Sequence, residues 1–311
     1  MKSYDKIMRN IERLGERYCR KYLDSWNKER LQNNWWAALK FFFSHSFMRG
    51  RRDKLSNEYY YFTIRTLEDY FLITSANLNN SYQRLKKQKE YFDKECILRF
   101  KKDKGMDMRT NSLNKKYKDE FKKEIAERNP IIKLLIISKE VEVKWDNKTD
   151  NKVISLGNEA DVMMVLDVLK FISDDDKKNI YNYLTNTIVN SGVKVAYERL
   201  IEMRGIADKI ATFVIRDIGL MSSEIKIADE DYKLAFPVDT WVNKIAHRLG
   251  CCSEDIEEIK NHLITKCKES KIDPLKFAAG LWFLGFHSVD ILLENCLGEI
   301  EIESITSANS G

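Results

Sequence analysis

The segment MRGIADKIA, at Met203–Ala211, decides how the middle of this chain folds. Apolar helical spacing ends at Met203, and a second apolar stripe begins at Ile210. Gly205 lies between them and allows a sharp turn, because glycine tolerates a positive φ. The segment therefore predicts two helices joined by a tight turn, with Lys209 in the first turn of the second helix. Backbone amides and the helix dipole at such a start favour a bound phosphate. An ordinary corner between two helices is the alternative interpretation.

A second segment, FPVDTWV at Phe236–Val242, predicts the start of another helix. Pro237 sets up the helix start, and Asp239 stands at the N-cap position ahead of an apolar stripe. Asp239 can serve as a structural cap alone, or it can also present its carboxylate to a ligand.

Together the two segments resemble the helix–hairpin–helix (HhH-GPD) DNA glycosylase superfamily, which includes endonuclease III, adenine glycosylase and the 8-oxoguanine glycosylases. The hairpin of that superfamily carries a G-hydrophobic-G-x-K-x-A pattern, which Gly205, Lys209 and Ala211 match. Its catalytic aspartate lies in a V-D-T-like sequence, found here at Val238–Thr240. Two features depart from the pattern. The second glycine of the pattern is Ala207 here, and the negatively charged Asp208 lies beside the lysine, which disfavours phosphate binding. The cysteine spacing does not match the iron–sulfur array of endonuclease III.

The separation of Lys209 from Asp239 is wider than in endonuclease III and resembles the archaeal-type 8-oxoguanine glycosylases. The segment GLWFLG at Gly280–Gly285 and the loop FMRGRRD at Phe47–Asp53 are similar to that group as well. The specific motifs cover Leu200–Leu249, and compatible architecture extends over residues 131–297 and part of the N-terminal region.

The resemblance implies a mostly α-helical, two-lobed HhH-GPD fold and a DNA glycosylase with AP lyase activity. Such an enzyme flips a damaged base, here with 8-oxoguanine favoured, out of duplex DNA. Lys209 would form a Schiff base with the sugar, and Asp239 would stabilise the positive charge on the deoxyribose. Gly205 and Ala207 would hold the DNA backbone. Neither step requires a metal or another cofactor.

Other functions remain open on the same residues. In a monofunctional glycosylase, Asp239 would activate water while Lys209 only holds DNA. Its substrate would be an alkylated base or a hypermodified base of phage DNA, which is a defence role. A protein of another class would bind DNA through the hairpin without catalysis.

A flipped base needs aromatic walls and hydrogen-bonding partners, although most aromatic residues at helical spacing belong to a core. The pocket candidates are Trp282, Phe286, His287, Trp241, Trp36 and His45. Three arginines, Arg49, Arg51 and Arg52, are candidates for contacting phosphates or filling the gap that the flipped base leaves.

The distribution of charge supports a polyanionic partner. Residues 1–130 carry 31 Lys and Arg against 18 Asp and Glu, whereas residues 131–311 carry 22 against 30. A basic half beside an acidic half is typical of a protein that grips DNA mainly from one side. Solvated lysine faces are the alternative.

Composition and patterning organise the 311 residues, whose 12 Gly and 3 Pro favour long helices. Helical spacing runs over residues 4–31, and Trp35–Phe43 is apolar on nearly all sides, which predicts a buried helix. We expect N-terminal helices over residues 1–75, a basic helical insert over 76–130 and a glycosylase core over 131–311. The insert could be a solvated helical pair or partly mobile. Alternation near residues 140–156 predicts one small β-hairpin.

Several classes of protein are disfavoured by the sequence. No apolar run approaches the roughly 20 residues that span a bilayer, and the first residues form a charged helical pattern rather than a signal peptide. The 6 cysteines show no paired framework, which favours reduced thiols over disulfides or metal sites. We expect a monomer in the cytoplasm, associated with the nucleoid when it is bound to DNA.

Overall fold

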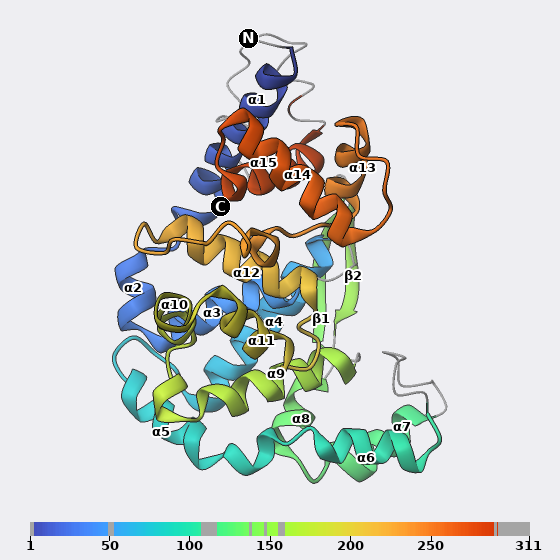
Figure 1. Cartoon of the computed structure of the whole chain (residues 1–311). Coiled ribbons are helices and arrows are strands. Elements are labelled where there is room, and N and C mark those ends of the chain that lie inside the picture. The colour runs from blue at the N-terminus through green and yellow to red at the C-terminus, as the bar shows by residue number, and fades with distance from the viewer. Residues whose placement is uncertain are drawn as a thin grey trace. The chain divides into compact units, whose positions relative to one another are not determined.

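The computed structural model describes residues 3–48, 53–106, 117–136, 139–145, 148–154, 159–288 and 291. These residues are mostly helical, which confirms the predicted fold class at that level (Figure 1). The chain divides into two compact units: unit 1 comprises residues 1–25 and 215–311, and unit 2 comprises residues 26–214. The boundaries expected at residues 75 and 130 both fall inside unit 2.

Unit 1 is built from an N-terminal and a C-terminal segment of the chain. Its helical elements are α1 (Ser3–Tyr18), the π-helical turn η1 (Cys19–Leu23), the 3₁₀ turn η6 (Tyr232–Ala235), α13 (Thr240–Arg248), α14 (Ile256–Ser270) and α15 (Pro274–Phe286). A further helix, α12 (Asp208–Met221), begins in unit 2 and ends in unit 1.

The main contact of unit 1 is between α1 and α15, which lie side by side (Figure 1). Gly15 and Gly280 make this contact close: a Cβ atom on Gly15 would lie 1.9 Å from the Lys276 carbonyl oxygen, and one on Gly280 would lie 1.8 Å from the Ile11 carbonyl oxygen. Helix α15 begins at a defined point, because Asp273 accepts hydrogen bonds from the next turn and Pro274 occupies the first helical position.

The helical stripe expected over residues 4–31 is divided. Helix α1 ends at Tyr18 and continues as η1, and a separate helix α2 (Lys28–Asn33) starts after Asn27. The Asn27 side chain accepts a hydrogen bond from the backbone N–H of Arg30 at 2.8 Å, which caps the new helix.

Unit 2 contains the remaining elements. After α2 they are α3 (Trp35–Ser46), α4 (Asp53–Phe71), α5 (Leu78–Lys87), η2 (Lys89–Phe92), α6 (Glu95–Asp103), α7 (Lys118–Phe121), η4 (Lys122–Ala126), α8 (Pro130–Ile136), β1 (Lys139–Trp145), β2 (Lys148–Ile154), α9 (Glu159–Ile172), η5 (Asp175–Lys177), α10 (Ile180–Ser191) and α11 (Val193–Ile201).

The core of unit 2 contains two helices that are buried on most sides. Helix α3 is the apolar helix expected at Trp35–Phe43, and Asn34 caps it by accepting hydrogen bonds from the N–H groups of Trp36 and Ala37. Helix α9 is buried along residues 162–166 and again at Val168 and Leu169. Strands β1 and β2 pair in antiparallel register, with Lys139 opposite Ile154 and Trp145 opposite Lys148.

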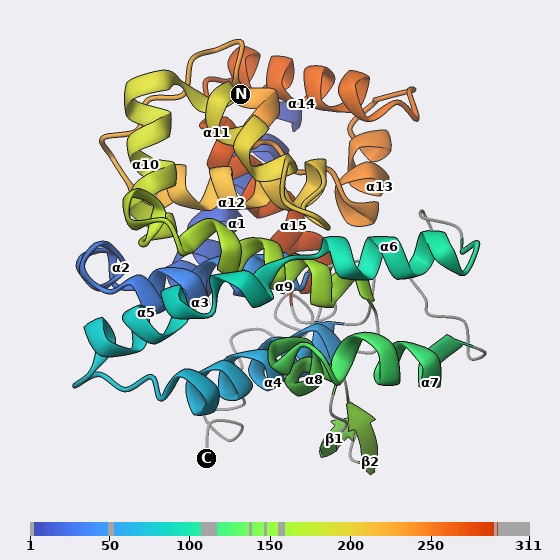
Figure 2. The ribbon, with the colours of Figure 1, turned by 90° about the horizontal axis from the view of Figure 1, so that it is seen from below.

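The basic segment at residues 76–130 is helical in its described part (Figure 2). Several of its lysines form ion pairs. The pairs are Lys86–Asp175 at 2.6 Å, Lys89–Asp174 at 2.5 Å, Lys104–Glu120 at 2.5 Å and Lys94–Asp167. The hydrogen bond from Lys89, followed by that from Lys177, lowers the pKa of Asp174. Part of the positive charge of this segment is therefore neutralised by carboxylates of the same unit.

None of the described helices combines the length and apolar character needed to cross a membrane. The described cysteines are free thiols: Cys251 and Cys267 are buried, Cys19 and Cys96 are partly buried, and Cys252 is exposed.

Candidate functional site

The predicted glycine turn is present between α11 and α12. Gly205 has a φ of +80°, and the N–H of Ile206 donates to the Met203 carbonyl oxygen at 3.0 Å. This is a β-turn whose third position requires a positive φ, which glycine supplies without steric cost. Met203 and Ile206 are buried on either side of the glycine and anchor the turn in unit 2.

The carboxylate of Asp167, in α9, holds this turn in place. Asp167 Oδ2 accepts a hydrogen bond from the backbone N–H of Arg204 at 2.8 Å, and the same carboxylate pairs with Lys94. Ala207 is exposed, and its carbonyl oxygen accepts from the N–H groups of Ile210 and Ala211, which starts α12. The first turn of α12 is therefore held at a defined position, with no side chain beyond Cβ at residue 207.

Lys209 is the second residue of α12 and is partly buried. Its neighbour Asp208 accepts a hydrogen bond from the Tyr197 hydroxyl at 3.0 Å. Asp208 is thus held by a residue of α11, and it lies in the first turn of α12, where the helix dipole favours a negative charge. The acidic neighbour that departs from the glycosylase pattern has a structural role in the hairpin.

Asp239 is the N-cap of α13, as its position in the sequence predicts. Its Oδ1 accepts hydrogen bonds from the N–H groups of Trp241 and Val242, both at 2.9 Å. Oδ2 makes no hydrogen bond with the described residues, and the side chain is only partly buried. The cap therefore orients the carboxylate through one oxygen and leaves the other open to a ligand.

Trp241 joins the start of α13 to the end of α15. Its side chain is 42% exposed, and Lys244 Nζ lies 5.0 Å from the centre of its ring. A Cβ on Gly285 would come within 2.4 Å of the Trp241 Cβ, so the indole packs directly on the α15 backbone. This contact sets where Asp239 stands relative to α15.

The C-terminal end of α15 carries a cluster of aromatic rings. Trp282 and Phe286 stack with their centroids 4.9 Å apart and an angle of 7° between planes. Tyr18 and Tyr22 meet Trp282 edge-on, at 5.6 and 5.4 Å. Phe286 is 39% exposed, so the stack ends in a ring that faces solvent.

His287 belongs to the same cluster but is buried. Its Nε2 lies 2.7 Å from the Tyr22 hydroxyl, and its ring centre lies 4.4 Å from that of Phe283. With 7% of its surface exposed, His287 supports the aromatic cluster from within unit 1.

The two pocket candidates near the N-terminus lie in the core of unit 2. Trp36 donates from Nε1 to Glu68 at 2.8 Å, and His45 Nδ1 lies 2.8 Å from the Phe41 carbonyl oxygen. Both are buried and hydrogen-bonded, so they belong to the core, as most aromatic residues at helical spacing do. Arg49, Arg51 and Arg52 lie outside the described residues.

The residues with predicted roles are divided between the units. Gly205, Ala207 and Lys209 belong to unit 2, and Asp239, Trp241, Trp282, Phe286 and His287 belong to unit 1. Within the described residues, no group of three or more His, Cys, Asp or Glu is arranged to hold a metal ion.

The structure also reveals a buried polar network that sequence reasoning missed. Arg216 and Asp217 form a salt bridge at 2.7 Å with both side chains buried. The Tyr18 hydroxyl donates to Asp217 at 2.6 Å and accepts from Arg216 at 2.7 Å. Burial, aided by Asp217, raises the pKa of Tyr18 well above its usual range. Adjacent opposite charges inside the apolar stripe of α12 were the signal in the sequence.

No family model matches the chain, and no solved structure matches it significantly. One curated relative, the "Uncharacterized protein MJECL21" of Methanocaldococcus jannaschii, is 31% identical over 113 residues. The similarity covers 32% of this chain and 26% of that relative, so the chain spans about a quarter of the protein that it matches.

Proposed function

We propose that this chain is a DNA glycosylase with AP lyase activity that removes a damaged or modified base, with 8-oxoguanine as the favoured substrate. The observation that carries the proposal is the turn between α11 and α12. It has Gly205 at positive φ and Lys209 in the first turn of the following helix.

The hairpin geometry suits contact with a DNA backbone. The start of α12 presents backbone N–H groups and the positive end of the helix dipole, which together favour a phosphate. Gly205 and Ala207 leave the approach to these amides open, because neither carries a side chain beyond Cβ. We therefore expect binding that is independent of sequence and strongly dependent on salt.

Asp239 would act on the sugar. As the base leaves, positive charge develops on the deoxyribose, and a fixed carboxylate stabilises that charge. The cap holds Oδ1, so Oδ2 is the atom assigned to this role. Because two backbone donors orient the carboxylate before substrate arrives, little reorganisation is needed during the reaction.

Lys209 would supply the nucleophile. Its neutral amine attacks C1′, and the bond to the base breaks with its electron pair leaving on the base. The nitrogen then loses one proton to the departed base and one to O4′, whose bond to C1′ breaks as the sugar ring opens, which yields an imine. Removal of a C2′ proton expels the 3′ phosphate and nicks the strand.

The aromatic cluster of α15 would receive the flipped base. The solvent-facing end of the Trp282–Phe286 stack offers a planar surface, and base–aromatic stacking contributes about 1–3 kcal/mol per base. Trp241 is the other exposed aromatic candidate in unit 1. This stacking would offset part of the few kcal/mol that flipping a nucleotide costs.

Borohydride trapping tests the proposal directly. Duplex oligonucleotides carrying 8-oxoguanine, uracil, an abasic site or hydroxymethylcytosine would be incubated with wild type, Lys209→Gln and Asp239→Asn. Lys194→Gln, which removes an exposed lysine of α11, is the matched control. We expect a covalent complex with wild type and with the control, and none with Lys209→Gln.

Other outcomes separate the alternatives. Abasic sites that depend on Asp239 but form without a trapped complex would indicate a monofunctional enzyme, with Lys209 as a phosphate ligand. DNA binding in which Asp239→Asn behaves as wild type, without base release on an extended panel of alkylated and hypermodified bases, would indicate a non-catalytic hairpin protein.

A further inference from the structure

Unit 2 has a polar groove that is distant from the hairpin in sequence. The groove has a volume of about 680 Å³ and lies where the end of α2, the start of α5 and the start of α10 meet. These three helices lie on the same side of unit 2 in both views (Figures 1 and 2). Its lining includes Gln32, Trp35, Asn79, Asn80, Lys178 and Asn179.

Hydrogen bonds between distant segments build this groove. Asn179 Nδ2 donates to the carbonyl oxygens of Leu31 and Gln32, at 2.8 and 3.1 Å. Trp35 Nε1 donates to the Leu78 carbonyl oxygen at 3.1 Å, and Lys178 Nζ donates to Asn79 Oδ1 at 3.2 Å. The three walls are tied together by side chains, so the groove is formed before any ligand arrives.

The chemistry of the lining selects the class of ligand. Most of the polar side chains are carboxamides, the one charged side chain is Lys178, and none of the described lining residues is acidic. Lysine, asparagine, glutamine and serine are among the side chains that contact DNA phosphates and sugars. Trp35 is buried, at 3% exposure, so its indole offers no open face on which a base could stack. The groove therefore fits a sugar-phosphate backbone rather than a flipped base.

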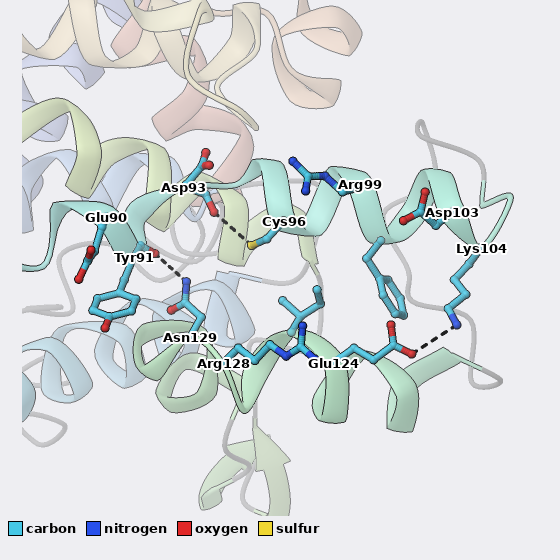
Figure 3. A pocket seen from close by; sticks show the side chains of 12 residues that line it. Glu90, Tyr91, Asp93, Cys96, Arg99, Asp103, Lys104, Glu124, Arg128 and Asn129 are labelled. Atoms are coloured by element: carbon cyan, nitrogen blue, oxygen red, sulfur yellow. Dashed lines mark hydrogen bonds and ion pairs between the residues drawn. The ribbon is translucent and has the colours of Figure 1, made fainter.

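Another cavity of unit 2 provides a contrast. It has a volume of about 500 Å³ and lies between α6 and η4 (Figure 3). Its lining includes the carboxylates of Glu90, Asp93, Asp103 and Glu124. Figure 3 shows Glu124 directed toward Lys104, with 3.5 Å between Oε1 and Nζ. A phosphate would meet these four carboxylates beside three cationic side chains, Arg99, Lys104 and Arg128, and we assign the cavity no DNA contact.

Of the three aspartates that precede Lys178 in sequence, Asp174 and Asp175 pair with lysines, and Asp176 is exposed to solvent. Asp174 pairs with Lys89 at 2.5 Å and with Lys177 at 3.1 Å, and Asp175 pairs with Lys86 at 2.6 Å. These partners offset the charge of both carboxylates.

We propose that this amide-lined groove, centred on Lys178, Asn79 and Asn80, binds the sugar-phosphate backbone of DNA as a contact additional to the α11–α12 hairpin. The proposal rests on the function proposed above. It assigns the polyanion contact of this part of unit 2 to an amide-lined groove with one lysine, rather than to the paired lysines of the basic segment.

The test is fluorescence anisotropy with an undamaged, labelled 25-base-pair duplex, titrated across a series of salt concentrations. Wild type would be compared with Lys178→Gln and with Asn80→Asp, which places a carboxylate in the groove. Lys170→Gln removes a lysine that pairs with Asp93 outside the groove and is the control. Ala207→Asp, at the start of α12, reports the hairpin contact.

We expect Lys178→Gln to weaken binding about 3- to 10-fold and to reduce the slope of log K against log salt by about 1. Asn80→Asp should weaken binding at least as much, and Lys170→Gln should behave as wild type. Melting temperatures must stay close to that of wild type, which separates a lost contact from a lost fold.

Three results would overturn the proposal. If Ala207→Asp weakens binding while both groove variants match wild type, the hairpin binds DNA and the groove does not. If wild type binds no duplex, the proposed function fails with it. If inorganic phosphate raises the melting temperature only when Lys178 is present, and the groove variants bind duplex normally, the groove holds free phosphate instead.

Discussion

At the residue scale, the Tyr18 hydroxyl completes a buried pair of charges. Arg216 and Asp217 are both fully buried, and the hydroxyl accepts from one and donates to the other. Additional hydrogen bonds help to offset the cost of removing a buried ion pair from water, and the Tyr18 hydroxyl makes two of them here. The Tyr18 ring also contacts Trp282 edge-on, so this network supports the aromatic cluster of α15.

Tyr18→Phe removes the hydroxyl and keeps the ring. We expect the free energy of unfolding to fall by about 1–3 kcal/mol, because charged groups lose a buried hydrogen-bonding partner. Urea denaturation at neutral pH measures the change. Tyr61→Phe, at a position that is 53% exposed, is the matched control and should change stability by less than about 0.5 kcal/mol. Equal effects for the two variants would contradict the role of the hydroxyl.

At the element scale, the position of α15 determines the site of unit 1. Its N-terminal half packs on α1 through Gly15 and Gly280, and its C-terminal half carries Gly285 against Trp241. At each contact a Cβ would meet backbone or the first atoms of a side chain, which cannot rotate away. Small residues thus let the helices approach closely enough to place Asp239 and the aromatic cluster on one unit.

Gly280→Ala should separate α1 from α15. The added Cβ would lie 1.8 Å from the Ile11 carbonyl oxygen, so the helices must shift, and we expect a loss of about 3 kcal/mol or more. Gly219→Ala, in α12, is the control, because its Cβ would meet the end of the Leu275 side chain at 2.9 Å and that side chain can move. Thermal unfolding followed by circular dichroism compares the two. A gain in stability at Gly280, as replacing a helical glycine ordinarily gives, would show that the contact does not limit the packing.

At the scale of the whole molecule, both units bury groups that must stay uncharged. Burial, aided by Asp217, raises the pKa of the Cys19 thiol to about 11. Burial also raises the pKa of Cys267, and of Tyr60 and Tyr82 in unit 2. In the unfolded chain, the pKa is about 8.5 for a Cys thiol and about 10 for a Tyr hydroxyl.

The protein should therefore lose stability in alkali. Because folding raises these pKa values, the stabilisation is fully present below the unfolded values and is lost as pH rises through the folded ones. We expect the melting temperature to fall progressively above about pH 8.5. The contribution of Cys19 is lost as pH rises to about 11, its folded pKa. Cys19→Ala should therefore lessen the fall in melting temperature between about pH 8.5 and pH 11. A melting temperature that rises over this range would contradict the prediction.

The sequence alone determined features whose causes are local. Helical periodicity predicted a mostly helical chain and the buried helix α3, and both are found. The turn at Gly205 and the cap at Asp239 followed from the φ that glycine tolerates and from N–H groups that a helix start leaves unpaired. Each of these features depends on residues only a few positions apart, so each can be predicted without knowledge of the tertiary structure.

Only the tertiary structure decided which of the candidate side chains are open to a ligand. Trp36, His45 and His287 are buried, whereas Trp241 and Phe286 are exposed. The sequence made all five of these aromatic residues pocket candidates on the same grounds. The partners of Tyr18 lie 198 and 199 positions away, and the lysines of the basic segment pair with carboxylates of α9 and η5. Burial and charge pairing depend on which distant segments meet, and no local pattern of residues specifies that.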